Sequence, residues 1–204
     1  MPPDFSFEDS LAGIVCGIDE VGRGPLAGPV VTAAVVLPRP LPVTLADHLD
    51  DSKKLSAKAR ERLFAIIMDC AQVGIGEASV AEIDRINILK ATFLAMGRAF
   101  AALARLTTVD HALVDGNQTP PLPVPVRCIV KGDSRSFSIA AASVVAKVTR
   151  DRQMTVLADA FPGYGWDRNA GYGTAAHRQA MARLGLTPHH RRSFGRIGDL
   201  FETL

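Results

Sequence analysis

Short apolar runs and longer helical patterns alternate along most of the chain. Residues 14–18 form an apolar run that ends at Asp19, and residues 30–37 form a β-branched run between two prolines, so both predict strands. Further short runs predict strands at residues 73–80, 111–114 and 126–130. Apolar positions at helical spacing predict helices at residues 57–71, 88–106, 136–161 and 174–184. This order predicts an α/β fold in which helices flank a mixed central sheet and a small helical extension follows.

Length and composition favour a single globular domain. The 204 residues are 48% hydrophobic and 22% charged, which provides enough apolar material for one core. We therefore expect one domain over residues 1–204, with residues 162–204 as a basic helical C-terminal extension. The longest apolar runs are far shorter than the roughly 20 residues of a membrane span, and the N-terminus is acidic where a secretory signal is basic. These features predict a cytoplasmic protein, and we expect a monomer.

Charge is distributed unevenly along the chain. Residues 1–120 hold 11 Lys and Arg against 15 Asp and Glu, whereas residues 121–204 hold 12 against 6. Ten of those 12 cations are arginines, whose side chain suits bidentate contact with phosphate. An ordinary solvated surface explains the same charge density equally well, so charge alone does not decide between the two interpretations.

Several common catalytic signatures are absent or incomplete. The glycine-rich segment GRGPLAG leads into a strand rather than a helix, which argues against dinucleotide binding. In GDSRS, Ser136 stands where a nucleophile elbow needs glycine. The chain has no phosphate-loop or HExxH signature, and its three cysteines are too far apart to indicate a zinc site.

Four acidic residues lie where predicted elements begin or end. Asp19 and Glu20 follow the first strand, Asp115 follows the strand at 111–114, and Asp133 precedes the helix at 136–161. Each alone has an ordinary explanation as a turn or capping residue. Together they would converge on one edge of a sheet, where two carboxylates about 4 Å apart repel by about 4 kcal/mol and need cations. Oxygen ligands without His or Cys favour Mg²⁺ or Mn²⁺.

Such a site is suited to phosphodiester chemistry. Two hard cations would activate an attacking water and stabilise the leaving oxygen of an in-line displacement. Arg23 in the glycine-rich segment, and Lys53 and Lys54 in DSKKLS, could hold neighbouring phosphates. An exposed lysine pair in front of a helix explains Lys53 and Lys54 equally well.

Seven segments, in order, resemble those of a known family, the bacterial type 2 ribonuclease H called ribonuclease HII. They are GIDEVGRGPLAGPVV from Gly17, DSKKLS from Asp51, EIDRINILKAT from Glu82, VDGN from Val114, KGDSRSFSIAAASVVAKVTRDRQM from Lys131, GYGTAAH from Gly171 and HHRRSF from His189. They span residues 17–194, nearly the whole chain, and their joint occurrence is highly specific. Val21 stands where many members have Ala, a departure that does not affect the assignment.

The resemblance implies a ribonuclease H-like fold and a specific activity. It implies that the catalytic carboxylates, which bind Mg²⁺ or Mn²⁺, are Asp19, Glu20, Asp115 and Asp133. The implied activity is hydrolysis of the RNA strand of RNA/DNA hybrids. It includes incision on the 5′ side of single ribonucleotides in duplex DNA, leaving 5′-phosphate and 3′-hydroxyl ends, as used in ribonucleotide removal during DNA repair and replication.

The resemblance also implies which residues contact the substrate. Gly22, Arg23 and Gly24 would contact the ribonucleotide 2′-OH and the junction, helped by Tyr172. We add Lys53 as a phosphate contact. Asp151 lies well inside a predicted helix, so we expect a surface ion pair there instead of a fifth catalytic carboxylate.

The remaining candidate residues have structural interpretations. We expect Tyr164 and Trp166 to pack, and the three histidines of the C-terminal region to be structural or to lie near phosphates: His177, His189 and His190. Residues 197–204 fit either a sliding-clamp binding tail or a short helix folded onto the domain, and their pattern does not favour a clamp.

Three other classes of protein fit the sequence less well. A resolvase or integrase nuclease of related fold would share the acidic cluster but lack the GRG triplet. Ribonuclease HIII also lacks the triplet and has an additional N-terminal domain, for which the 13 residues before the first predicted strand leave no room. A non-catalytic nucleic-acid-binding module would use the arginine-rich half, but converging carboxylates repel a phosphate backbone unless metals intervene.

Overall fold

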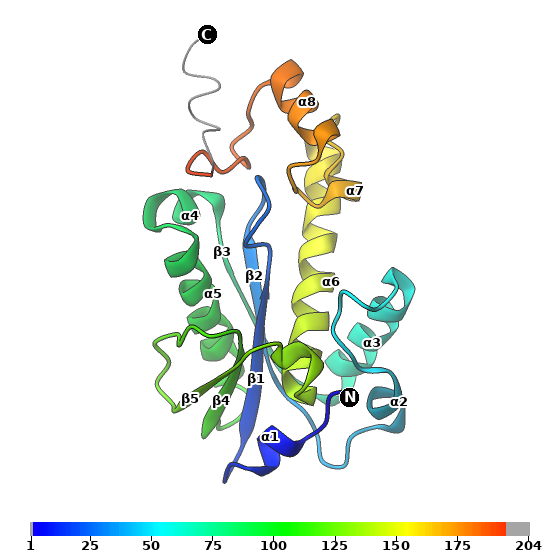
Figure 1. Ribbon diagram of the computed structural model, residues 1–204, viewed down its shortest axis with the longest axis vertical. Helices are drawn as coiled ribbons and strands as arrows, with labels where there is room; N and C mark the ends of the chain where they lie inside the picture. The colour runs from blue at the N-terminus through cyan, green and yellow to red at the C-terminus, as the bar shows by residue number, and fades with distance from the viewer. Residues whose placement is uncertain (1, 195–204) are drawn as a thin grey trace.

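Within residues 2–194, which the computed structural model describes, five strands form one mixed sheet (Figure 1). The strands are β1 (Val15–Val21), β2 (Val30–Val36), β3 (Gln72–Ala78), β4 (His111–Asp115) and β5 (Val126–Ile129). Their order across the sheet is β3-β2-β1-β4-β5. β2 is antiparallel to both β1 and β3, while β4 is parallel to β1 and to β5. The predicted α/β fold with a mixed sheet is confirmed.

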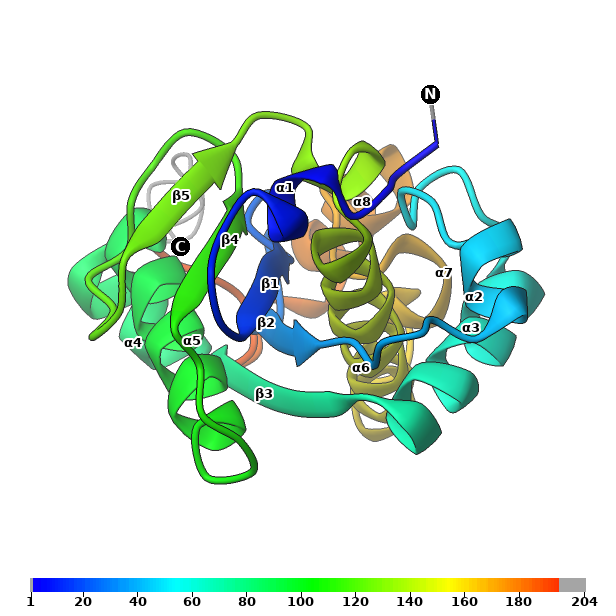
Figure 2. The ribbon, with the colours of Figure 1, turned by 90° about the horizontal axis from the view of Figure 1, so that it is seen from below.

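Helices cover both faces of the sheet (Figure 2). α5 (Ile88–Leu103) packs on one face, whereas α6 (Phe137–Ala160) and α3 (Ala57–Cys70) lie on the other. Alternation along β2 explains the division, because Ala33 and Val35 pack in the core under α6 and Ala34 packs in the core under α5. The central strand β1 therefore lies between two helical layers.

Glycines let the helices approach the sheet closely. A Cβ at Gly74 or Gly76 of β3 would collide with the backbone of α5. A Cβ at Gly17 of β1 would collide with the backbone of Ser138, at the start of α6. Because Gly17 and Asp19 share one face of β1, the start of α6 lies beside Asp19.

Most predicted boundaries agree with the structure to within a few residues. Ser56, Ser136 and Thr174 each cap a helix by accepting a hydrogen bond from the backbone three residues ahead. Four short helices of the described region were not predicted, because they hold too few residues for a clear apolar period: α1 (Ser6–Asp9), α2 (Val43–His48), α4 (Val80–Ile86) and α7 (Trp166–Asn169). α4 still carries a signal, since Ser79 and Glu82 form a capping box, and Val80 belongs to this helix rather than to β3.

β1 runs through the acidic pair instead of ending there. It continues to Val21 because its antiparallel pairing with β2 extends as far as Val31. Asp19 and Glu20 therefore lie inside a strand, which corrects the predicted strand end, whereas Asp115 closes β4.

The C-terminal part of α6 extends beyond the sheet, and a smaller, separate hydrophobic cluster forms there (Figure 1). α7 and α8 (Ala175–Leu184) lie at that end of the molecule. Trp166, Tyr164 and Met154 pack there with Ala27 from the loop between β1 and β2. The region that contains α7 and α8 is helical, as predicted. It packs against the glycine-rich loop through Ala27.

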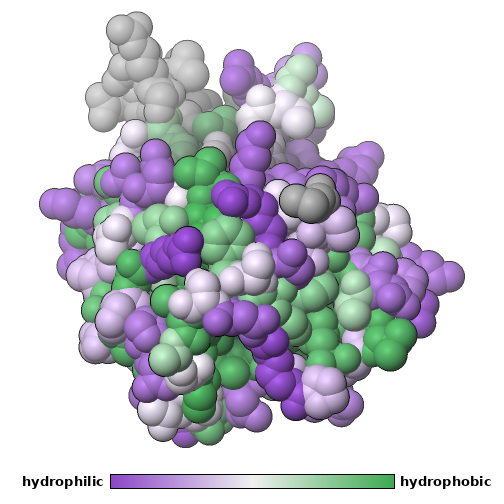
Figure 3. Space-filling view, turned by 60° about the horizontal axis from the view of Figure 1, so that its bottom comes forward, coloured by the Kyte–Doolittle hydropathy of each residue, from purple (hydrophilic) through white to green (hydrophobic). Residues whose placement is uncertain are grey.

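Charged residues interrupt the longest helix within residues 2–194. This helix, α6, has 24 residues and carries Lys147, Arg150, Asp151 and Arg152 near its middle. No helix in this range is apolar enough over a sufficient length to cross a membrane. On the face seen in Figure 3, hydrophobic residues are interspersed with hydrophilic ones.

Candidate active site

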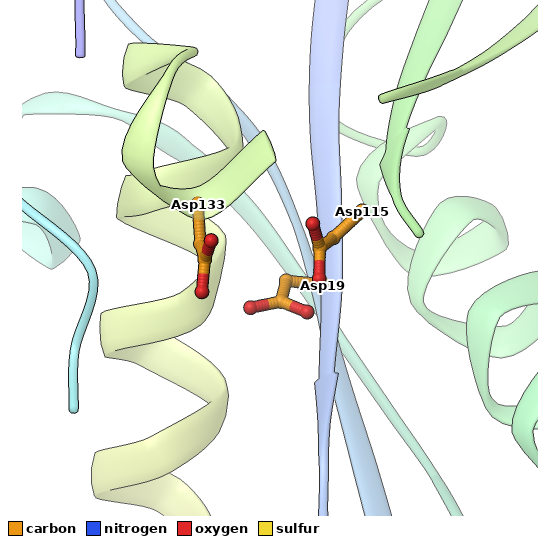
Figure 4. A group of neighbouring side chains, drawn as sticks. All are labelled: Asp19, Asp115 and Asp133. Carbon is orange, nitrogen blue, oxygen red and sulfur yellow. The ribbon is translucent and has the colours of Figure 1, made fainter. Parts of the chain in front are cut away.

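Three aspartates from separate segments meet beside the start of α6 (Figure 4). Asp19 comes from β1, Asp115 from the end of β4, and Asp133 from a 3-10 turn, η1 (Gly132–Ser134), just before α6. Each offers one carboxylate oxygen, and these oxygens lie within 4.8 Å of one another. The predicted convergence of these three residues is confirmed.

Backbone pairing sets the positions of these side chains. The parallel register of β1 and β4 places Ile18 opposite Val114, which brings the following residues, Asp19 and Asp115, side by side. The backbone N–H of Gly132 donates a 2.6 Å hydrogen bond to Oδ1 of Asp115 and ties β4 to the turn before α6. Strand pairing and this hydrogen bond therefore organise the site.

Burial and repulsion between carboxylates oppose the ionisation of Asp19 and Asp133. Asp19 and Asp133 are each only 5% exposed. Burial, followed by the charges of Glu20, Asp115 and Asp133, raises the pKa of Asp19 well above its ordinary value. Burial also raises the pKa of Asp133, although the hydrogen bond from Lys53 opposes this shift. A cation among the three carboxylates would relieve the repulsion and favour the ionised forms.

Glu20 lies beside the three aspartates rather than among them. Within the described part of the chain, the group with metal-ligand spacing contains Asp19, Asp115 and Asp133. Oε1 of Glu20 instead accepts a 3.3 Å hydrogen bond from Nη1 of Arg23. Burial raises the pKa of Glu20, and the charge of Arg23 opposes that shift.

The available ligand atoms suit a divalent cation. Three aspartate carboxylates without nitrogen or sulfur ligands are the donors that Mg²⁺ and Mn²⁺ prefer. Oε2 of Glu20 is buried without a hydrogen-bond partner. It therefore offers a fourth carboxylate oxygen beside the three aspartates. The residues present therefore fit a hard metal ion.

Two buried arginines hold the glycine-rich loop between β1 and β2. Arg150 donates hydrogen bonds to the carbonyls of Ala27 and Pro29, at 3.0 and 2.9 Å. Arg191 donates to the carbonyl of Gly28 at 2.9 Å. Burial lowers the pKa of Arg150 to about 10 and that of Arg191 to about 9. Both guanidinium groups thus support the loop from inside the protein.

Sequence reasoning missed Arg150 and Arg191. The excess of arginine after residue 120 suggested phosphate contacts, but these two side chains are fully buried and bond to the protein's own carbonyls. An arginine in a sequence does not reveal which distant carbonyl groups it will contact in the fold. The sequence pattern therefore did not indicate this role.

The GRG triplet follows β1 and begins with a constrained glycine. Gly22 has a φ of 95°, a conformation that favours glycine, and a Cβ there would collide with Arg150. The half-exposed side chain of Arg23 turns back to Glu20. The triplet is therefore joined to the acidic site through the ion pair between Arg23 and Glu20.

Tyr172 lies against the last glycine of this triplet. A Cβ built on Gly24 would be 3.6 Å from Cε1 of Tyr172, an ordinary van der Waals distance. The backbone N–H of Leu26 donates a 2.8 Å hydrogen bond to the carbonyl of Gly171, so the two loops are also joined through their backbones. The Tyr172 side chain remains 46% exposed. The structure thus brings together two predicted substrate-binding residues that are far apart in the sequence.

The segment with the two lysines approaches the site from the other side. Nζ of Lys53 donates a 3.1 Å hydrogen bond to Oδ2 of Asp133. The hydroxyl groups of Ser52 and Ser143 lie 2.6 Å apart and hold this segment against α6. Lys54 instead pairs with Asp50 at 2.9 Å. Only Lys53 of the two lysines contacts the acidic site.

Other predicted residues have the structural roles expected of them. Asp151 pairs with Lys147 one helical turn earlier, at 2.7 Å, as predicted. Trp166 is fully buried and Tyr164 stacks on it, with their ring centroids 5.1 Å apart. These aromatic side chains pack the C-terminal region, as the sequence predicted.

The family comparison identifies this arrangement. Residues 16–197 match the family model described as Ribonuclease HII. The chain belongs to the ribonuclease HII family. Ribonuclease HII from Paramagnetospirillum magneticum is 65% identical over 198 residues, which cover 97% of this chain and 98% of the relative. As a member of this metal-dependent family, the chain is a type 2 ribonuclease H endonuclease.

Solved structures of ribonuclease HII relatives share the fold. Ribonuclease H2 from Pyrococcus horikoshii is 26% identical with a TM-score of 0.75, covering 94% of this chain and 98% of that one. Ribonuclease HII from Archaeoglobus fulgidus, in a complex with PCNA, is 25% identical with a TM-score of 0.73, covering 90% and 96%. The ribonuclease H-like fold expected from the sequence is confirmed. Residues 197–204, considered above as a clamp-binding tail, lie outside the described residues.

Proposed function

We propose that this ribonuclease HII hydrolyses the RNA strand of RNA/DNA hybrids and incises duplex DNA on the 5′ side of single embedded ribonucleotides. Water adds to phosphorus and the bond to the 3′ oxygen breaks, which leaves a 3′-hydroxyl and a ribonucleotide with a 5′-phosphate. The observation that carries the proposal is the position of the Tyr172 ring beside Gly24 of the GRG triplet, where an added Cβ would lie 3.6 Å from Cε1 of the ring. Such cleavage serves ribonucleotide removal in DNA repair and replication, and we expect a monomer that acts in the cytoplasm.

The proposed metal-binding and catalytic set consists of four carboxylates: Asp19, Glu20, Asp115 and Asp133. The three aspartates have oxygens within 4.8 Å of one another, and Glu20 has an unpartnered buried oxygen. Bound Mg²⁺ or Mn²⁺ would supply the Lewis acidity that activates water and stabilises the leaving oxygen. The protein's part is to hold these oxygens in place through strand pairing and the hydrogen bond from Gly132 to Asp115.

The GRG triplet is the proposed reader of the ribose. A protein distinguishes RNA from DNA at one position through the 2′-hydroxyl. Gly24 has no Cβ, and the nearest heavy atom to the place where one would stand belongs to the Tyr172 ring, so a sugar packed against this ring could lie close to the Gly24 backbone, whereas Arg150 fills that side of Gly22. We therefore assign Gly22 to the turn that positions Arg23 and Gly24. Arg23 and Lys53 would hold flanking phosphates, as positioning contacts that carry no sequence preference.

Tyr172 is the proposed reader of the step from RNA to DNA. Its half-exposed ring lies next to Gly24, where the ribonucleotide would bind. A ring stacked on the sugar of the following nucleotide would exclude a second 2′-hydroxyl there. The site would then favour a ribonucleotide followed by a deoxyribonucleotide.

The test compares a DNA duplex that contains one ribonucleotide with a uniform RNA/DNA hybrid, each with Mg²⁺ or Mn²⁺. Tyr172→Ala should lose most activity on the single ribonucleotide while retaining metal binding by calorimetry. Tyr172→Phe is the matched control, because it keeps the stacking ring. Equal losses on both substrates would assign Tyr172 a general structural role, and unchanged rates would show that it only packs its loop.

A further inference from the structure

Two buried histidines lie beside the Tyr172 loop. His177 of α8 is fully buried, and His190 is nearly so. Their Nε2 atoms lie 3.2 Å apart. Nδ1 of His177 also lies 2.9 Å from the backbone carbonyl oxygen of Tyr172. The pair has no part in the proposed hydrolysis, so its connection to Tyr172 needs a separate explanation.

Neighbouring donors determine which nitrogen of each imidazole carries the proton. The indole N–H of Trp166 donates to Nε2 of His177 at 2.9 Å, which places the proton of neutral His177 on Nδ1. That N–H donates to the Tyr172 carbonyl. The backbone N–H of Thr187 donates to Nδ1 of His190 at 3.0 Å, so the proton of neutral His190 lies on Nε2 and points at Nε2 of His177, whose single lone pair it shares with the Trp166 indole. The hydrogen bonds therefore run in one direction, from Thr187 through both histidines to Tyr172.

Backbone contacts hold Tyr172 more than side-chain packing does. Its side chain is 46% exposed, and the residue lies between Gly171 and Gly173. Besides the bond from His177, its carbonyl accepts a 2.8 Å hydrogen bond from the N–H of Thr174. The direction of the ring therefore depends on how firmly this short backbone segment is fixed.

We propose that His177 and His190 are positioning residues, which fix the Tyr172 backbone and thereby set the preference for single ribonucleotides. This inference rests on the proposed junction role of Tyr172. Moving the proton of either imidazole to its other nitrogen would place two N–H donors, or two lone pairs, opposite each other. The network is therefore stable in one arrangement, in which His177 donates to the Tyr172 carbonyl. Without the bond from His177, the loop would keep its contact to Thr174 but lose a fixed ring position.

Two substitutions of His177 test the contributions of its two ring nitrogens separately. His177→Asn places an amide nitrogen where Nδ1 stands, so it keeps the bond to Tyr172 and loses the contacts to Trp166 and His190. His177→Gln places its amide near the position of Nε2 and loses the bond to Tyr172. Both variants are assayed as the full chain with Mg²⁺, on a duplex with one ribonucleotide and on a uniform RNA/DNA hybrid.

The expected signature is a change in the ratio of the two cleavage rates. His177→Gln should cleave the single-ribonucleotide duplex about tenfold more slowly and the uniform hybrid within about twofold of the parent rate, because one buried hydrogen bond is lost. His177→Asn should restore the ratio to within about threefold of the parent value. In a Tyr172→Ala background, His177→Gln should leave the ratio unchanged, since the ring that it positions is gone.

A second variant keeps the inference testable if His177→Gln does not fold. Trp166→Phe retains His177 but removes one of the two donors to its Nε2 and leaves the one from His190, so it should shift the ratio in the same direction by a smaller factor than His177→Gln. Equal losses on both substrates, or the same effect from the Asn and Gln variants, would overturn the inference. Failure of the proposed function is distinguishable, because Tyr172→Ala alone would then leave the ratio unchanged whatever the histidine variants do.

Discussion

Nζ of Lys53 lies 3.1 Å from Oδ2 of Asp133, although 80 residues separate the two in sequence. The Asp133 side chain is nearly buried, whereas that of Lys53 is 76% exposed. Burial lowers the pKa of Lys53, but the hydrogen bond and charge of Asp133 outweigh this effect and raise it. Lys53 therefore stays cationic, neutralises part of the acidic site and remains accessible to a phosphate.

Lys53→Ala should weaken binding of an RNA/DNA hybrid about three- to tenfold and leave the cut position unchanged, because one phosphate contact is lost. The slope of log K against log salt should become shallower by about 0.9. Binding curves at several salt concentrations measure both effects. Lys54→Ala is the matched control, since Lys54 pairs with Asp50. A slope equal to that of the parent protein would remove the phosphate assignment from Lys53.

Asp19→Asn should reduce cleavage by at least about 10²-fold, because it removes a charge that holds the metal. The same change should raise the thermal midpoint of the metal-free protein. The folded-state pKa of Asp19 is raised, so the metal-free protein gains stability as pH falls through that pKa and loses it as pH rises. Asparagine cannot ionise and should flatten this dependence.

Thermal unfolding with and without Mn²⁺, together with single-turnover cleavage, tests the change at Asp19. The added metal should stabilise the parent protein more than Asp19→Asn. Asp151→Asn serves as a control, because Asp151 pairs with Lys147 on α6. Turnover near the parent value in Asp19→Asn would exclude Asp19 as a metal ligand.

The sequence predicted the parts of the site that depend on local pattern. Apolar runs indicated the strands, and the acidic residues beside them indicated where Asp19, Asp115 and Asp133 would meet. The end of β1 was wrong because pairing with β2, a non-local interaction, carries the strand on to Val21. Local pattern also gave no indication that Glu20 would bond to Arg23 rather than join the three aspartates.

The support of the glycine-rich loop could not be predicted in this way. Arg150 and Arg191 meet the loop only after α6 and the C-terminal segment have packed against it. Their charge suggested a surface role, whereas the structure uses their fixed N–H donors inside the protein. Such roles depend on tertiary contacts between distant residues, which hydrophobic periodicity does not encode.

Arg191→Met should lower the free energy of unfolding by about 3 kcal/mol or more. The substitution leaves the buried carbonyls of Gly28 and Gly22 without this donor, and each such loss costs about 1–3 kcal/mol. Urea unfolding measures the effect. Arg192→Met is the matched control at an exposed neighbouring position and should change stability by no more than about 0.5 kcal/mol. Similar effects of the two variants would contradict the buried role of Arg191.

His190 should reduce the stability of the protein in mildly acidic solution. Burial, followed by the charge of His177, lowers the pKa of His190 from 6.5 to about 4. Between these pH values the unfolded chain binds a proton at His190 and the folded protein does not. The free energy of unfolding should therefore fall by about 1.4 kcal/mol per unit as pH drops through this window, and the contribution should be complete above it.

His190→Asn isolates this contribution. The asparagine carbonyl can accept the hydrogen bond from the backbone N–H of Thr187, as Nδ1 of His190 does, but it cannot bind a proton in this range. The variant should be less stable than the parent protein at neutral pH, and its stability should fall less steeply between pH 6.5 and about 4. Denaturant unfolding at several pH values gives both slopes. His48→Asn controls for the loss of an exposed imidazole, and equal slopes for His190→Asn and the parent would show that His190 is protonated in the folded protein.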